Sequence, residues 1–197
     1  MLQLVYPSDT APMMGEPVSA ARRRAAGKKY EEFPIVDTSG LVIGRATREF
    51  CHTSGLKPLH PVVHMHIIDR FSRVYLQRRS DTKDYCPGCW DSAVGGHVTY
   101  GESLEEALVR ESSEEIGFKD FNPRHLLTYI FENDAQRELV TVFVTISSKD
   151  PVPDNDEVQD GRFWTDEEIM KAMGTGVFTP DFEEEYVEIR KSLFALL

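Results

Sequence analysis

The chain has few cysteines, little positive charge and no long apolar run. Its 197 residues include 3 cysteines, an odd number that favours reduced thiols and a cytoplasmic location. No apolar segment is long enough to span a bilayer, and the N-terminus lacks the hydrophobic stretch of a secretory signal peptide. With 22 Lys and Arg against 33 Asp and Glu, the net charge of −11 argues against general nucleic-acid binding and membrane-surface binding.

What is present fits one globular domain behind an N-terminal extension. Hydrophobic residues make up 41% and charged residues 28%, which is ordinary for a folded protein with a sizeable core. Residues 1–32 are expected to form a flexible extension, because they are rich in proline and small residues and contain a basic run over residues 22–29. Contact of this extension with a second subunit, as in a homodimer, or with a polyanion is the alternative. Residues 33–197 are expected to form the domain.

The pattern of residues 33–197 predicts an α/β fold, in which helices flank a mixed sheet. The predicted strands cover residues 34–37, 41–45, 61–68, 73–77, 92–94, 125–131, 138–147 and 161–164. The predicted helices begin at Ser103, at Thr165 or Asp166, and at Pro180 or Asp181. A loop is expected from Arg79 to Trp90, and a long polar loop over residues 149–156.

Residues 96–118 are the most informative segment, with the sequence GHVTYGESLEEALVRESSEEIGF. Ser103 and Glu106 form a capping box, which predicts that a helix begins there, and Gly117 suits its end. On such a helix an apolar stripe continues into three carboxylates, those of Glu111, Glu114 and Glu115.

Partly buried carboxylates that lie close together repel one another and are costly to bury unless a cation compensates. A hard divalent cation with oxygen ligands, Mg²⁺ or Mn²⁺, is the expected compensator. A solvated acidic helix face is the alternative interpretation of a glutamate cluster taken alone.

The spacing of this segment resembles the signature of the Nudix hydrolases, G-x5-E-x7-R-E-U-x-E-E-x-G-U, where U is a bulky aliphatic residue. The matching residues are Gly96, Glu102, Arg110, Glu111, Glu114, Glu115 and Gly117, with Phe118 at the apolar closing position. Ser112 departs from the pattern, on the packing side of the helix, and this departure should affect stability more than chemistry. The resemblance implies a Nudix-type α/β/α sandwich. It also implies hydrolysis of a diphosphate joined to another group, with a cation that screens the phosphates and activates the attacking water.

The resemblance also implies roles for individual residues. The expected metal ligands are Glu111, Glu114, Glu115 and the backbone carbonyl of Gly95, while Glu102 and Arg110 are expected to support them. The general base is expected to be Glu111 or Glu138. The substrate is expected to be a small diphosphate compound derived from a nucleotide, whose identity this pattern does not specify.

A second resemblance concerns residues 77–97, QRRSDTKDYCPGCWDSAVGGH, which look like the Nudix branch that contains isopentenyl-diphosphate isomerase. In that branch, the positions of Arg79 and Lys83 hold the substrate diphosphate. The metal-binding histidines of the isomerases roughly match His52, His60 and His97, and their catalytic glutamate matches Glu138.

Several departures weigh against isomerase activity, including a spacing from His52 to His60 that is one residue longer and the retention of every acid in the segment R-E-U-x-E-E. Gly95 stands where the isomerases have a catalytic cysteine, and Gln136 stands where they have a metal-binding glutamate. Without the thiol, proton transfer to and from a carbon skeleton loses one of its two partners. The hydrolase is therefore the preferred interpretation, with an isomerase-like enzyme and a non-catalytic nucleotide-binding module as alternatives.

The remaining cysteines and histidines leave several interpretations open. Cys86 and Cys89 form a C-x-x-C motif that could be a redox pair or half of a zinc site with Cys51 and His52. His52, His60 and His97 could bind a metal or be ordinary packed side chains. His64 and His66, which alternate along a predicted strand, are expected to be structural.

Overall fold

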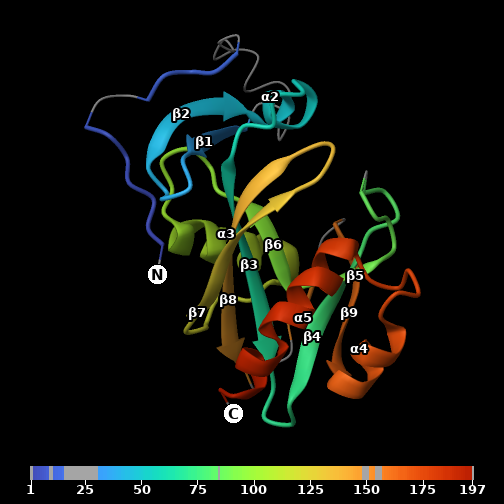
Figure 1. Ribbon diagram of the computed structural model, residues 1–197. Coiled ribbons are helices and arrows are strands. Elements are labelled where there is room, and N and C mark those ends of the chain that lie inside the picture. The colour runs from blue at the N-terminus through green and yellow to red at the C-terminus, as the bar shows by residue number, and fades with distance from the viewer. Residues whose placement is uncertain are drawn as a thin grey trace. The chain divides into compact units, whose positions relative to one another are not determined.

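The computed structural model describes residues 2–8, 11–15, 31–83, 85–147, 151–153 and 157–196. Along these residues, single helices separate groups of two to four strands, and two helices follow the last strand (Figure 1). The strands are β1 Glu32–Val36, β2 Val42–Thr47, β3 His60–Ile68, β4 Arg73–Arg79, β5 Trp90–Asp91, β6 Val94–His97, β7 Arg124–Glu132, β8 Arg137–Ile146 and β9 Val158–Thr165. The helices are α2 Arg48–Thr53, α3 Leu104–Ile116, α4 Asp166–Ala172 and α5 Pro180–Phe194. No helix in the described residues is long and apolar enough to cross a bilayer.

The strands form two sheets. β1 and β2 pair antiparallel as a hairpin, as predicted, with a register shift between Ile35 and Val36. The second sheet has the order β5-β4-β3-β8-β7, with β6 paired to β3 and β9 paired to β4. β4 runs antiparallel to β3, β5 and β9. The predicted α/β class with a mixed sheet is confirmed.

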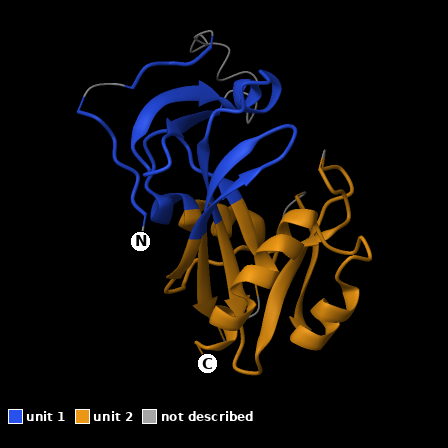
Figure 2. Ribbon diagram, viewed as in Figure 1, with its two compact units in different colours: residues 1–63, 96–107, 128–141 blue, residues 64–95, 108–127, 142–197 orange. Residues whose placement is uncertain are grey.

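The chain divides into two compact units (Figure 2). Unit 1 comprises residues 1–63, 96–107 and 128–141, and unit 2 comprises residues 64–95, 108–127 and 142–197. The elements that contribute residues to both units are β3, β6, α3, β7 and β8.

In unit 1, the described part of the N-terminal extension bonds to the β1–β2 hairpin. Val5 forms a parallel bridge with Leu41, and Met13 forms one with Arg45. Ala11 is buried with Val36 and other apolar residues in a small core. Residues 16–30, which include the basic run, lie outside the described residues.

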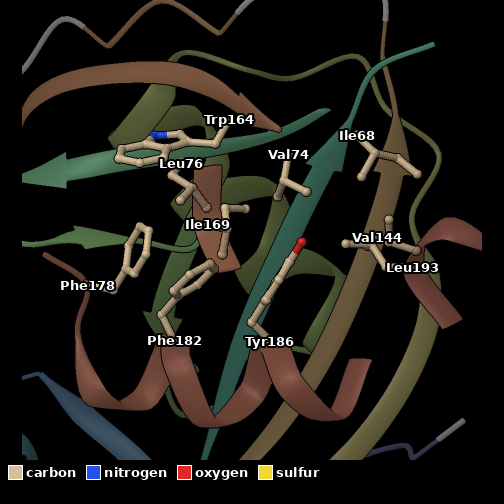
Figure 3. Packing of buried hydrophobic residues seen from close by; sticks show 10 residues of the cluster. All are labelled: Ile68, Val74, Leu76, Val144, Trp164, Ile169, Phe178, Phe182, Tyr186 and Leu193. Atoms are coloured by element: carbon tan, nitrogen blue, oxygen red, sulfur yellow. The ribbon is translucent and has the colours of Figure 1, made fainter. Parts of the chain in front are cut away.

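In unit 2, the core gathers between α5 and the strands (Figure 3). Phe182, Tyr186 and Leu193 lie on one face of α5 at helical spacing, and pack with residues of β3, β4 and β8 such as Ile68 and Val74. α5 begins at Pro180 after the N-cap Thr179, whose side chain accepts a hydrogen bond from the Phe182 amide.

Three local predictions were wrong or incomplete. The short helix α2 was not predicted, although Thr47 caps it by accepting from the Phe50 amide. The short strand expected near residues 92–94 is displaced, because β5 ends at Asp91 and β6 covers Val94–His97. β6 includes two glycines, a residue with low strand propensity. Its hydrogen bonds with β3 therefore form in spite of the low strand propensity of its own sequence. Arg79 ends strand β4 instead of opening a loop.

Candidate functional site

Helix α3 carries the glutamates that the sequence singled out. The predicted capping box is confirmed, since the Glu106 amide donates to Ser103 Oγ at 3.2 Å and the Ser103 amide donates to Glu106 Oε2 at 2.8 Å. The helix ends at Ile116, and Gly117 follows with φ +62°, the left-handed conformation that suits glycine. A Cβ at Gly117 would lie 2.9 Å from the backbone oxygen of Val152, which adds a steric reason for glycine.

Ser112, the departure from the family pattern, is fully buried and has a defined partner. Its hydroxyl donates to the Phe118 carbonyl at 2.6 Å, just beyond the end of α3. The Phe118 amide donates in turn to the Ser112 carbonyl at 3.1 Å. The serine therefore satisfies a carbonyl at the helix end where an aliphatic residue would only fill space.

Glu115 is the most buried carboxylate of the signature segment. Its side chain is 8% exposed, and Oε2 accepts hydrogen bonds from the Gly95 amide and from Gln77 Nε2, each at 3.1 Å. Burial, together with the neighbouring Glu111, raises the pKa of Glu115 to about 7, although the two hydrogen bonds oppose the shift. The folded protein thus holds a carboxylate whose negative charge is poorly compensated without a cation.

Glu111 and Glu114 share a partner, Arg110. Arg110 Nη1 donates to Glu111 Oε1 at 2.6 Å and lies 3.6 Å from Glu114 Oε2. The Glu111 side chain is 12% exposed, whereas that of Glu114 is 54% exposed. The three carboxylates thus range from buried to solvated, and Arg110 holds two of them by charge-assisted contacts.

Gly95, the expected backbone ligand, lies on β6. Its amide bonds to Glu115, and a Cβ at this position would lie 3.5 Å from His64 Cδ2 and 3.6 Å from His64 Nε2. His64 Nδ1 and His66 Nε2 contact the two oxygens of the buried Glu185 at 2.8 and 2.6 Å. These contacts tie β3 to α5 and lower the pKa of Glu185, against its desolvation. They agree with the structural role expected for both histidines.

The two cations expected to hold a diphosphate both have acidic partners. Arg79 Nη1 lies 3.2 Å from Asp91 Oδ2, and Arg79 Nε donates to the Tyr85 carbonyl at 3.1 Å. Lys83 Nζ lies 2.6 Å from Glu157 Oε2. Both residues lie in unit 2 with Glu115, and a contribution of Lys83 to the pKa of Glu115 places its charge within electrostatic reach of that carboxylate.

The two remaining expected site residues belong to unit 1. Glu102 accepts a hydrogen bond from the Thr99 amide at 2.9 Å, and its backbone carbonyl accepts from the Tyr6 hydroxyl at 3.0 Å. Glu138 is buried on β8, with Oε1 at 3.8 Å from His60 Nε2 and 3.5 Å from His97 Nε2. Glu102 thus stabilises the turn before α3, and Glu138 lies among histidines.

The three histidines form one cluster in unit 1. One ring nitrogen from each of His52, His60 and His97 lies within 4.8 Å of the others, a spacing that could hold a metal ion. The His97 ring stacks on Phe33 with centroids 4.4 Å apart. Burial lowers the pKa of His60 to about 4, with a further contribution from His97, and burial and then Arg48 lower the pKa of His52. His60 is fully buried, whereas His52 and His97 are partly buried, and burial disfavours the charged form of His60 and of His52.

The cysteines are all free thiols in the structure. Cys86 has φ +45° and accepts the Cys89 amide at its carbonyl, so the C-x-x-C segment forms a tight turn. Cys89 Sγ donates to the Gly176 carbonyl at 3.7 Å. Among the described residues, the histidine cluster is the three-ligand group with metal spacing, and no cysteine belongs to it.

Two residues that contact the site were not singled out from the sequence. Gln77 bonds to Glu115, and Glu185 bonds to both His64 and His66. Each had a usable signal. Gln77 is a polar residue that continues a buried apolar strand, and Glu185 interrupts the apolar face of α5 beside Phe182 and Tyr186. A buried polar residue requires a partner, although its identity depends on the fold.

Comparison with known proteins agrees with this geometry. The family model described as NUDIX domain matches residues 58–182. An uncharacterized Nudix hydrolase of Streptomyces coelicolor, SCO1686, is 31% identical over 162 residues, which cover 81% of this chain and 88% of that protein. An isopentenyl-diphosphate Delta-isomerase of Leifsonia xyli is 37% identical over 87 residues, or 44% of this chain and 46% of that protein. The crystal structure of DR0079 from Deinococcus radiodurans has a TM-score of 0.69 at 23% identity, covering 80% of this chain and 98% of that one. The chain belongs to the Nudix hydrolase family.

Proposed function

We propose that this protein is a metal-dependent diphosphohydrolase that cleaves the diphosphate linkage of a nucleoside diphosphate derivative. The observation that carries the proposal is the environment of Glu115. Its carboxylate is buried, adjoins Glu111 and has a pKa raised to about 7. A divalent cation beside these oxygens would stabilise both charges, and carboxylate and carbonyl oxygens are the ligands that Mg²⁺ prefers.

Mg²⁺, or Mn²⁺, would be held by Glu111, Glu114, Glu115 and the carbonyl of Gly95. When bound, the cation would polarise the phosphate oxygens and screen their charge. The protein's own groups orient these ligands. The Gly95 amide and Gln77 fix one oxygen of Glu115, and Arg110 contacts the other two glutamates.

Arg79 and Lys83 are the proposed diphosphate-binding cations. Each has a carboxylate partner in the structure, Asp91 or Glu157, so substrate phosphates would compete with these carboxylates. An arginine can bind a phosphate through two parallel hydrogen bonds, whereas lysine acts as a point charge. We therefore assign the larger share of substrate orientation to Arg79.

We assign the general base to Glu111, with Glu138 as the alternative, and a supporting role to Glu102 through the turn before α3. Glu111 is favoured because it adjoins Glu115 in the proposed metal site. The free thiols of Cys51, Cys86 and Cys89 are compatible with the cytoplasmic location that the sequence favours.

The test is cleavage of a panel of nucleoside diphosphate derivatives into a nucleoside monophosphate and the second phosphomonoester, measured with Mg²⁺, with Mn²⁺ and with excess chelator. Activity should require the cation and should fall about tenfold or more in Glu115→Gln. Glu188→Gln, which removes the same charge from an exposed position of α5, should keep full activity. Full activity in chelator or in Glu115→Gln would refute the metal mechanism. Nucleotide binding without turnover would favour a non-catalytic module.

An isomerase-like enzyme is the second candidate, because His52, His60, His97 and Glu138 gather as the resemblance to that branch implies. Gly95 still lacks the thiol that the isomerases use at that position. Incubation with isopentenyl diphosphate should therefore give no dimethylallyl diphosphate. Formation of that product at enzymatic rates would make the histidine cluster and Glu138 the primary site.

A further inference from the structure

The cluster of His52, His60 and His97 is a possible metal site that is separate from the glutamates of the proposed hydrolase site. Its resemblance to the isomerase branch implies a bound metal, and its spacing would allow one. Whether the cluster can bind a cation depends on where each imidazole carries its proton, because a metal ligand must present an unprotonated nitrogen.

His60 meets this requirement. Its Nδ1 lies 2.9 Å from the Pro58 carbonyl oxygen, which can only accept, so Nδ1 carries the proton of the neutral ring. Nε2 is then unprotonated, is buried and has no hydrogen-bond partner within the described part of the chain. This arrangement, in which a backbone carbonyl fixes the tautomer, is common behind metal-binding histidines.

His97 has the opposite arrangement. Its Nδ1 lies 3.2 Å from Nη1 of Arg48, and a guanidinium can only donate, so Nδ1 accepts. The proton of the neutral ring is therefore on Nε2, the nitrogen that faces Glu138 Oε1 at 3.5 Å. The nitrogen that would bind a shared metal beside Glu138 is the protonated one.

Arg48 is held in this position by other contacts in unit 1. Its Nη1 lies 3.7 Å from Glu31 Oε2, and its guanidinium lies 5.9 Å from the centroid of the Phe33 ring. Glu31 also accepts from the Thr99 hydroxyl at 3.2 Å. The positive charge of Arg48 adds electrostatic repulsion toward any cation in the cluster, and it already lowers the pKa of His52.

We propose that Arg48 keeps the His52, His60 and His97 cluster closed to transition metals by fixing His97 with its proton on Nε2, and that the cluster is a latent zinc-type site. Without the guanidinium, His97 Nδ1 can carry the proton and Nε2 can join the other two imidazoles and Glu138. Three histidines and one carboxylate form a suitable donor set for Zn²⁺.

The test is Zn²⁺ affinity, measured by competition with a chromogenic chelator at constant pH. Arg48→Met, which keeps an unbranched apolar stem and removes the charge and the donors, should bind Zn²⁺ at least about tenfold more tightly than the wild type. Adding His60→Ala to Arg48→Met should abolish the gain, which assigns it to this cluster and not to the glutamates of α3. Lys57→Met removes a positive charge that pairs with Glu132 in the same unit, and should leave Zn²⁺ affinity unchanged.

Equal Zn²⁺ affinity in Arg48→Met and wild type would overturn the proposal, as would a gain that survives His60→Ala. A second measurement needs no variant at this site. Long-range ¹H–¹⁵N correlation spectra of the histidine-labelled wild-type protein should show His97 as the tautomer protonated on Nε2 and His60 as the one protonated on Nδ1. His97 protonated on Nδ1 would refute the proposal even if Arg48→Met did not fold. Neither readout depends on phosphohydrolase activity.

Discussion

Replacing Glu115 by glutamine should stabilise the metal-free protein at neutral pH, although it should impair the proposed enzyme. The substitution keeps the shape of the side chain, and the amide oxygen can still accept from the Gly95 amide and Gln77. It removes a buried charge whose desolvation is the main reason for the raised pKa of Glu115. Stability and activity should therefore change in opposite directions.

The size of the effect follows from proton linkage. The folded pKa of Glu115 is about 7 and the ordinary pKa of a glutamate is 4.5, so between these pH values the folded protein binds more protons than the unfolded chain. The free energy of unfolding should then fall as pH rises from 4.5 through 7. The difference of about 2.5 in pKa corresponds to about 3 kcal/mol. Glutamine does not titrate, so the unfolding free energy of the variant should exceed that of the wild type by up to this amount at high pH.

Urea unfolding of both proteins in chelator, between pH 4.5 and 8, measures the difference. The difference in unfolding free energy between variant and wild type (the gap) should be small near pH 4.5, widen through pH 7 and then level off. Titrating groups that both proteins share contribute equally to each free energy and cancel in the difference. Saturating Mg²⁺ should shrink or reverse the gap, because the cation would stabilise the wild-type carboxylate. Glu188→Gln, at an exposed helix position, is the control and should show no pH-dependent gap. A gap that stays constant across this range would refute the assignment of a buried, raised-pKa carboxylate to Glu115.

Three further predictions concern other parts of the chain. Arg79→Ala should lower kcat/KM by about tenfold to a hundredfold, from the loss of a charge-assisted phosphate contact, and lower Tm slightly through loss of its contact with Asp91; unchanged kinetics would make Arg79 purely structural. His60 has a folded pKa of about 4, below the ordinary 6.5, so between these pH values the unfolded chain binds more protons and stability falls as pH drops. His60→Gln should remove this part of the acid sensitivity, measured by urea unfolding. Gly117→Ala should lower the free energy of unfolding by about 1–3 kcal/mol. The loss should exceed that of Gly174→Ala, because Gly174 has a similar positive φ but a Cβ there would have no neighbour within 4 Å. Equal losses in the two variants would argue against the contact with Val152.

The parts of the fold that short-range signals determine were predictable. The beginning of α3 depends on Ser103 and Glu106, and its end depends on Gly117, all close in sequence to the helix itself. The strand β6 was not predictable in the same way. Its glycines carry no strand signal, and it forms because β3, far away in the sequence, supplies hydrogen bonds.

The candidate site shows the same limit. The spacing of Glu111, Glu114 and Glu115 identified them as a group, but not which of them is buried. The acidic partners of Arg79 and Lys83 could not be inferred either. Glu157 is 74 residues from Lys83 in the sequence, so no local pattern indicates the ion pair between them.

The difference in burial among the three glutamates implies that they contribute unequally to metal affinity. The Glu114 side chain is 54% exposed, so water can stabilise its charge, and the absence of a cation should cost this residue little free energy. Glu111 is largely buried but contacts Arg110, which compensates part of its charge. Glu115 is buried, and its Oε2 accepts from two neutral groups, the Gly95 amide and Gln77, so its charge should gain most from a cation. Metal affinity should therefore depend most strongly on Glu115 and least on Glu114. The metal-free glutamine variants should show the same ordering as a gain in stability, because removing the least compensated buried charge stabilises the metal-free protein most.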